Sequence, residues 1–178
     1  DQAITAFNYY QIEDGMRPDM VAQKLYDDPE LDWVVLTSNN IINVRDQWPL
    51  SNNDLHAHVL EKYGSEENAL GIHHHETIEI LDEYRRIIIP AGLQVDANFT
   101  FKYKNYSNRE ILVRPAVAVT NYDYEIKLND EKRRIKVLRP EYLNTYITDH
   151  REIMEYDESS DFIAKRLKGT YNPRLSGV

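Results

Sequence analysis

The sequence contains no cysteine, which excludes disulfide bonds, thiolate metal ligands and a cysteine nucleophile. No apolar run approaches the about 20 residues of a membrane-spanning helix, so we expect no membrane partner. The opening stretch, DQAITAF, has neither the basic nor the apolar segment of a signal peptide. Gly-rich phosphate-binding loops and the Gly-x-Ser-x-Gly turn of hydrolases are also missing from the chain.

Positive charge is scarce, with 21 Lys and Arg residues against 30 Asp and Glu residues and a formal net charge of -9. This balance argues against a general nucleic-acid binder, whose surface is basic. Tyrosine is abundant, at 13 residues against 4 Phe and 2 Trp. Tyrosine is typical of protein interfaces, but it also lines the half-buried rim of a small α+β domain, and composition leaves both readings open.

The first part of the chain predicts a strand followed by three helices. Residues 7–12 are aromatic and β-branched, and a turn dipeptide follows them. Capping residues then mark the helix ends: Pro18, Asp28 and Pro29 begin the first two helices, Ser51 and Asp54 begin the third, and Gly64 ends it.

From Gly71 the pattern becomes β-rich, with strands expected in IHHHETIEIL, RRIIIPAGLQV, FTFKYKNY and EILVRPAVAV. Residues 119–132 are ambiguous, because Tyr122, Tyr124 and Ile126 alternate as in a strand while the composition favours a helix. RIKVL predicts a further strand, and Pro140 opens a late helix. The fold class is therefore α+β, with regions 1–64, 65–139 and 140–178.

Five of the six histidines lie between His56 and His75, and three are consecutive. Alternation along a strand puts His73 and His75 on one face and His74 on the other, in or near the core. That split spoils a three-ligand site, and HHHET lacks the spacing of zinc proteases. We expect no metal, no cofactor and no catalytic residue, and the carboxylates show no pair set apart by an apolar environment.

The segment after residue 161 is basic, although the chain is acidic. It carries Lys165, Arg166, Lys168 and Arg174 and no acidic residue. One reading is a frayed terminus that happens to be basic; the other is an arm that docks on an acidic neighbour. Together with Tyr142 and Tyr146 on the late helix, these four residues are the candidates for partner contacts.

The stretch YYQIEDGMRPDMVAQKLYDDPELDWVVLTSNNI resembles a LysM module, which runs strand, helix, helix, strand. LysM modules bind N-acetylglucosamine polymers between the first turn and the loop after the second helix. The resemblance places these two segments at Asp14, Gly15, Met16 and Arg17 and at Asn39, Asn40, Ile41 and Ile42. The apolar second helix and the long loop INVRDQWPLS depart from the carbohydrate-binding type.

A narrower resemblance covers about Ala6 to Tyr156. RPDMVAQKLYDDPELDWVVLTSNNI, then WPLS, NYDYEIKLNDEKRRIKVL and IMEY, are similar to the LysM-like wedge subunits of T4-type phage baseplates. The resemblance implies a non-enzymatic protein of a contractile tail, which contacts wedge core proteins and links neighbouring wedges into a six-fold ring. It also implies a helix at the start of NYDYEIKLNDEKR, and assembly in the host bacterial cytoplasm.

The leading hypothesis is thus a structural component of a virion tail baseplate, whose partners are other wedge proteins. The alternative is a LysM protein that binds peptidoglycan or chitooligosaccharides through the two groove segments. A metal-dependent hydrolase built on the histidines is a third hypothesis, which analysis of bound metal would test.

Overall fold

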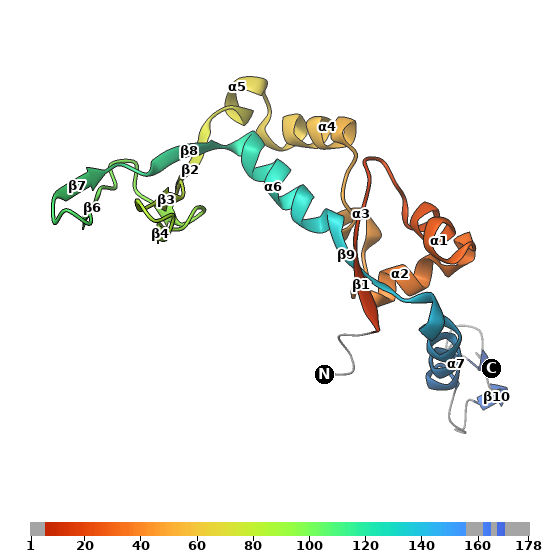
Figure 1. Ribbon diagram of the computed structural model, residues 1–178. Helices are drawn as coiled ribbons and strands as arrows, with labels where there is room; N and C mark the ends of the chain where they lie inside the picture. Colours follow the sequence, from red (N-terminus) through yellow and green to blue (C-terminus); the bar gives the residue numbers. More distant parts are fainter. Residues whose placement is uncertain (1–5, 156–161, 165–166, 170–178) are drawn as a thin grey trace. The chain divides into compact units, whose positions relative to one another are not determined.

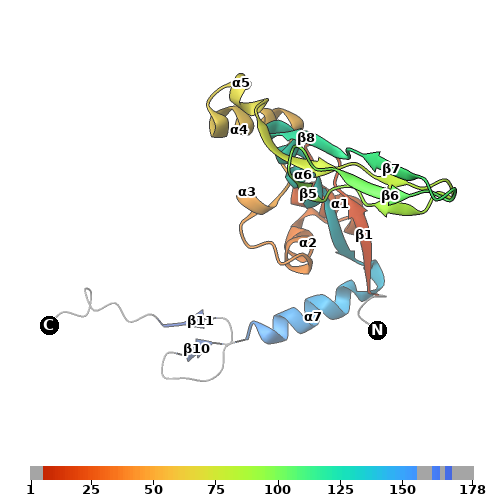
Figure 2. The ribbon, with the colours of Figure 1, turned by 90° about the vertical axis from the view of Figure 1, so that its left-hand side faces the viewer.

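The computed structural model describes residues 6–155, 162–164 and 167–169 of the chain. It divides into two compact units. Figures 1 and 2 show the helices and strands, coloured along the sequence. Unit 1 comprises Asp1–Tyr9, Pro18–Asn39 and Lys136–Val178, and unit 2 comprises Tyr10–Arg17 and Asn40–Ile135. Helices and strands occur in both, which confirms the α+β class.

Unit 1 runs strand, helix, helix, strand. Its elements up to residue 138 are β1 (Phe7–Gln11), α1 (Pro18–Tyr26), the 3-10 helix η2 (Pro29–Leu31), α2 (Asp32–Ser38) and β9 (Arg134–Leu138). β1 pairs with β9, far along the sequence, and both strands continue into unit 2. Backbone hydrogen bonds of 2.9 Å, from Arg139 to Ala6 and from Ile12 to Arg133, close the two ends of the pair and make it antiparallel.

Helices α1 and α2 of unit 1 bury the apolar stripes that the sequence predicts. Val21, Ala22, Val34 and Val35 are completely buried. Tyr26 donates a hydrogen bond of 3.0 Å from its hydroxyl to the carbonyl of Leu138, and burial raises the pKa of this phenol. Strand β9 thus closes the core that α1 and α2 begin.

Local capping explains where these helices begin. Pro18 occupies the first position of α1, where the missing N–H costs nothing. Asp28 precedes η2, and its carboxylate accepts a hydrogen bond of 2.9 Å from the N–H of Glu30. After β9, the 3-10 helix η3 (Pro140–Tyr142) leads into α7 (Leu143–Ile153), and β10 (Phe162–Ala164) pairs with β11 (Leu167–Lys168).

The helices of unit 2 are α3 (Val44–Gln47), α4 (Asn52–Tyr63), α5 (Glu66–Ala69) and α6 (Asn121–Arg133). Ser51 caps α4 and Gly64 ends it with a φ of 79°, as the sequence predicts. Helix α5 was not predicted, although Ser65 caps it through the N–H of Asn68 at 3.2 Å. Buried side chains from α4 and α5 pack with partly buried ones from α4, from the residue before its cap and from α6: Leu55, Val59, Ala69, Leu50, Tyr63, Tyr122 and Ile126.

Residues 72–120 of unit 2 form what we call the hairpin segment. Its sheet has the order β5-β2-β8, built from Gln94–Val95, Ile72–Thr77 and Ala116–Thr120, and all pairs are antiparallel. Two further hairpins are β3 (Ile80–Leu81) with β4 (Ile87–Ile89) and β6 (Phe101–Lys104) with β7 (Glu110–Val113). Pro115 separates β7 from β8 and is completely buried.

The ambiguous stretch 119–132 is mainly helical, because α6 begins at Asn121. Thr120 accepts a hydrogen bond of 3.0 Å from the N–H of Asp123, a cap that alternation cannot reveal. The family resemblance therefore predicted this element correctly, and the alternating pattern was wrong. No helix in the described part of the chain is long and apolar enough to span a membrane.

Candidate docking sites

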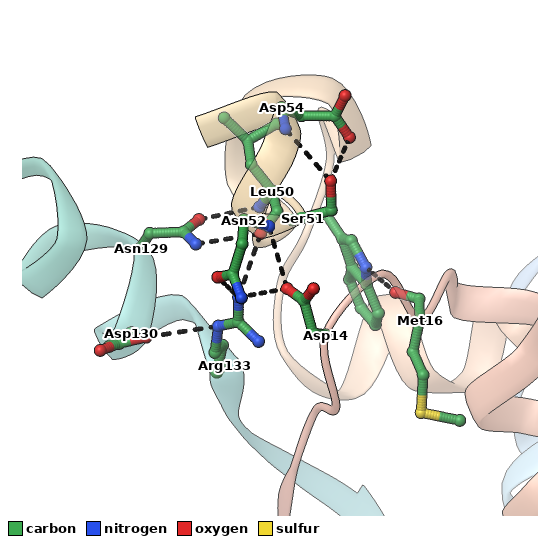
Figure 3. Close-up of polar contacts among 10 residues, drawn as sticks. Asp14, Met16, Leu50, Ser51, Asn52, Asp54, Asn129, Asp130 and Arg133 are labelled. Atoms are coloured by element: carbon green, nitrogen blue, oxygen red, sulfur yellow. Dashed lines mark hydrogen bonds and ion pairs between the residues drawn. The ribbon is translucent and has the colours of Figure 1, made fainter. Parts of the chain in front are cut away.

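The turn after β1 is held by the guanidinium of Arg133 at the end of α6 (Figure 3). Arg133 Nη2 lies 2.9 Å from Asp14 Oδ1, 3.3 Å from the Leu50 carbonyl and 3.3 Å from Asn52 Oδ1. The N–H of Asn52 also donates to Asp14 Oδ1 at 3.0 Å. The hydrogen bond from Arg133 lowers the pKa of the Asp14 carboxyl.

Two more side chains fix this network. Buried Asn129 brackets the backbone of Leu50, accepting from its N–H at 2.8 Å and donating to its carbonyl at 3.0 Å. Asp130 lies 3.3 Å from Nε of Arg133. On the other side of the turn, Trp48 donates 2.7 Å from its indole to the carbonyl of Met16. The predicted binding turn is therefore fastened to the beginning of α4 and the end of α6.

The second predicted binding segment has different neighbours. The side chain of Asn39 accepts from the N–H of Lys136 and donates to its carbonyl, both at 2.7 Å, and so ties the end of α2 to β9. Asn40 has a φ of 53°, a left-handed conformation that asparagine tolerates. Ile42 is 87% exposed, and its N–H donates to Gln47 Oε1. A glycan groove between the two segments stays a prediction.

The histidine strand departs from the predicted alternation. A register shift in β2 lies between Ile72 and His74, and it brings His73 and His74 together instead of separating them. Their Nδ1 atoms are 2.8 Å apart, and the ring of His73 stacks on Tyr124 at 4.0 Å. Strict alternation was wrong here because the bulge adds a residue to β2. His74 has a side-chain exposure of 10%, close to the core as expected.

A carboxylate and a lysine complete the histidine cluster. Glu76 Oε1 lies 2.9 Å from His74 Nε2 and 2.8 Å from Lys127 Nζ on α6. The hydrogen bond from Lys127, followed by that from His74, lowers the pKa of Glu76. Within the described residues, no three His, Cys, Asp or Glu side chains gather as metal ligands. The cluster instead joins β2 to α6.

The sequence analysis did not identify a buried carboxylate on α6. Glu125 is 6% exposed and accepts hydrogen bonds from Lys62 at 2.6 Å and Tyr63 at 3.0 Å. Burial alone would raise the pKa of Glu125, but these two hydrogen bonds outweigh it and lower the pKa. The signal was present, since Glu125 shares one helix face with Tyr122 and Asn129 once a helix is assumed.

The turns of the two hairpins present exposed aromatic rings. Tyr84 and Tyr106 meet edge to face at 5.6 Å, and the guanidinium of Arg86 lies 5.5 Å from the Tyr84 ring. Asp82 holds one turn by accepting from the N–H groups of Tyr84 and Arg86, each at 2.8 Å. Tyr106 remains 80% exposed. Ordered turns that expose tyrosine are typical of protein-binding surfaces.

The two predicted contact tyrosines lie in successive elements, Tyr142 at the end of η3 and Tyr146 in α7, and their environments differ. Tyr146 donates 2.9 Å to Thr37 Oγ1 and stacks on Trp33 at 6.0 Å, so it packs within unit 1. His150 lies on the same indole at 4.5 Å. Tyr142 is 40% exposed. Lys165, Arg166 and Arg174 lie outside the described residues, as does the side chain of Lys168 in β11.

The model of one protein family, the base plate wedge protein 53 of phages, matches residues 1–153. The chain belongs to this family. A search of curated proteins finds no match. Family membership makes the chain a structural component of a phage tail baseplate, which interacts with other baseplate proteins.

The extent of the family match separates the body of the chain from its tail. The match ends at Ile153, which is also the last residue of α7. It therefore contains both helical cores, the hairpin segment and the Arg133 network. The basic residues from Lys165 onward lie beyond it.

Proposed function

We propose that this wedge protein docks on wedge core proteins of a contractile tail and links neighbouring wedges into a ring. Unit 1 serves as a LysM-like docking module, and the protein carries no catalytic site. Membership in the wedge protein family is the observation that carries the proposal. Two features of the structure support its details.

The first is the order of elements in unit 1. The order is strand, helix, helix and strand, as in a LysM module, with β9 as the closing strand and residues 40–133 inserted before it. The unusually apolar α2 is accounted for, because Val34 and Val35 fill the core and Trp33 packs against α7. The departure from a glycan-binding sequence thus has a packing role.

The second feature is the apolar surface of the hairpin segment. Large apolar side chains are exposed along its strands and turns: Ile72, Ile78, Leu81, Tyr84, Ile87, Leu93, Tyr106, Leu112 and Val117. Apolar surface of this extent favours a segment that becomes buried against partner proteins. A protein clamped between neighbours needs such a surface, whereas an isolated domain gains nothing from it.

Docking is preferred to glycan binding because of the state of Asp14. Its carboxylate already accepts hydrogen bonds from Arg133 and the N–H of Asn52, and Met16 is engaged by Trp48. Asp14 Oδ1 and the Met16 carbonyl are therefore already used within the fold, and a sugar that bonds to these atoms would compete with Arg133, Asn52 or Trp48. A change of Asp14 would also disturb the turn itself, so Asn40 is the better position for testing sugar binding.

Co-expression with the wedge core proteins of the same phage tests the proposal. We expect the chain to co-purify with them, and baseplate rings to be visible by electron microscopy only when it is present. Tyr106→Ala should weaken co-purification, whereas His56→Ala, an exposed aromatic change on α4, should not. Normal rings formed without the chain would contradict the ring-linking role.

A further inference from the structure

Strand β8 is the outer strand of its sheet, and its hydrogen-bonding pattern shows which groups face outward. The N–H of Ile78 donates 2.8 Å to the carbonyl of Pro115. With the register that pairs Glu76 with Val117 and His74 with Val119, this bond makes those two pairs the hydrogen-bonded ones. The backbone groups of Val117 and Val119 therefore point toward β2, and those of Ala116 and Ala118 point away from it.

The hydrogen bonds between β2 and β5 confirm which residues of β2 face each neighbouring strand. The backbone N–H of Thr77 donates a hydrogen bond of 2.9 Å to the carbonyl of Leu93, and its carbonyl accepts one of 2.8 Å from the N–H of Gly92. Odd-numbered residues of β2 thus bond toward β5, and even-numbered ones toward β8. In the described part of the chain, no strand pairs with the outer edge of β8.

Strand β8 lacks the charges, the internal proline and the bulge that commonly protect an edge strand. Proteins shield such edges with lysine, with proline inside the strand, with a bulge or with very short strands. Ala116–Thr120 has five residues, no charge and no internal proline, and the bulge of this pair lies on β2. The side chains of Ala116 and Ala118, whose backbone groups form the edge, are small enough to admit another backbone.

We infer that this edge takes an extended segment of another baseplate protein as a fourth strand. Alternating donors and acceptors spaced along a strand are complementary only to another extended backbone. The incoming segment is uncharged and apolar where it crosses the sheet, because Val117, which is 48% exposed, and Val119 carry no charge to attract a charged residue. Its backbone hydrogen bonds would hold it on β8, and its side chains would set the register.

The partner is a different protein and not a second copy, and this part of the inference rests on the proposed function. Pairing of β8 with β8 of another copy requires a two-fold axis and uses the edge of both copies. Neighbouring copies in a ring of more than two are related by a rotation smaller than the half-turn of a two-fold axis, so their equivalent edges do not face each other. A different protein repeated in every wedge can occupy every edge.

Backbone amide exchange tests the inference without any substitution. In the free chain, the amides of Val117 and Val119 should exchange slowly and that of Ala118 fast. In tail baseplates that contain the chain, we expect exchange at Ala118 to slow by about tenfold or more. Unchanged exchange at Ala118 in such baseplates would overturn this inference and leave the proposed function intact. A chain that enters no baseplate would remove both.

The dependence of amide exchange on the concentration of the free chain distinguishes a second copy of the chain from a different protein as the partner. If Ala118 became protected in the free chain as its concentration rose, the edge would pair with itself, and the inference of a different protein would be wrong. Exchange at Ala118 that is independent of concentration in the free chain, together with protection in the baseplate, supports it.

A proline at the edge provides the matching genetic test. Ala118→Pro removes the outward N–H and leaves the hydrogen-bonded pairs of Val117 and Val119 with β2 in place. The residue before a proline favours an extended backbone, which Val117 already has. We expect the variant to fold, and its affinity for the wedge proteins to fall by about tenfold or more. Ala118→Ser retains the N–H and should bind like the wild type. Wild-type binding by a folded Ala118→Pro variant would overturn the inference; if the variant did not fold, amide exchange in the wild-type chain would decide.

Discussion

Unit 1 and the hairpin segment differ in where they place their apolar side chains. Unit 1 buries Val21, Ala22, Val34 and Val35 completely within a small strand–helix–helix–strand core. The hairpin segment has more strands, but its apolar residues line exposed faces and turns, and Ile89 is one of the few that are buried. The comparison indicates that one part of the chain is stabilised by its own core, whereas the other leaves apolar surface exposed, which partners would cover under the proposed function.

The largest expected effect comes from adding a charge to each region. Val34→Asp places an unpaired carboxylate in a completely buried position, and we expect a loss of more than about 4 kcal/mol in the free energy of unfolding of unit 1. Val117→Asp changes an exposed strand position and should lower the free energy of unfolding by less than about 1 kcal/mol. Urea unfolding followed by circular dichroism measures both. Equal losses would contradict the distinction between the regions.

Aromatic truncation sharpens the same comparison. Trp33→Ala removes the ring on which Tyr146 and His150 pack, and should lower the free energy of unfolding by about 2 kcal/mol. Tyr106→Ala should change it by less than about 0.5 kcal/mol, because this ring is 80% exposed. Its effect should instead fall on wedge assembly. Stability of the free protein and recovery of wedge complexes should therefore rank the two variants in opposite orders.

Two residues with left-handed backbone provide a smaller test. Gly64 has a φ of 79° at the end of α4, so Gly64→Ala should destabilise the protein by about 1 kcal/mol. Arg85 has a φ of 61° in the β3–β4 turn, and Arg85→Gly should be neutral or stabilise by up to about 0.5 kcal/mol. Thermal unfolding distinguishes the signs. A destabilising Arg85→Gly would show that this side chain has a further role in the turn.

The smallest effect is a gradual loss of stability in acid. The pKa values of Asp14, Glu76 and Glu125 in unit 2 are lowered in the folded state, so their contribution is present above the unfolded pKa and is lost as the pH falls through the folded pKa. We expect the amides of α4 and α6 to lose protection below about pH 4.5, before those of α1 and α2. Amide exchange at several acidic pH values measures the order. Earlier loss in α1 and α2 would contradict it.

Elements with local signals could be predicted from the sequence. Caps at Asp28, Ser51 and Gly64 mark helix ends because each satisfies backbone groups within a few residues. The pairing of β1 with β9 could not be read this way, since no local pattern specifies a partner so far along the chain. The bulge at His73 is likewise set by the pairing of β2 with β8 and not by the histidines themselves.

The candidate site was predicted in part. The turn at Asp14–Gly15 was correctly placed, but its engagement by Arg133 depends on the end of α6, which was ambiguous between helix and strand. Glu125 was missed for the same reason, because its inward direction follows only from helical periodicity. The role of the groove segments in binding remains a prediction, which a chitooligosaccharide pull-down of the wild type and an Asn40 variant would test.

Strand β9 is synthesised long after α1 and α2, so the core of unit 1 can close only late in synthesis. Asn39 and Lys136, which bond each other, are 97 residues apart. At about 5–20 residues per second, a ribosome takes about 5–20 s to make the intervening chain. During that time α1 and α2 have no closing strand, while nearly all of unit 2 is synthesised. A nascent chain that ends before β9 would therefore carry most of unit 2 and an open core of valines, which chaperones or proteases could recognise.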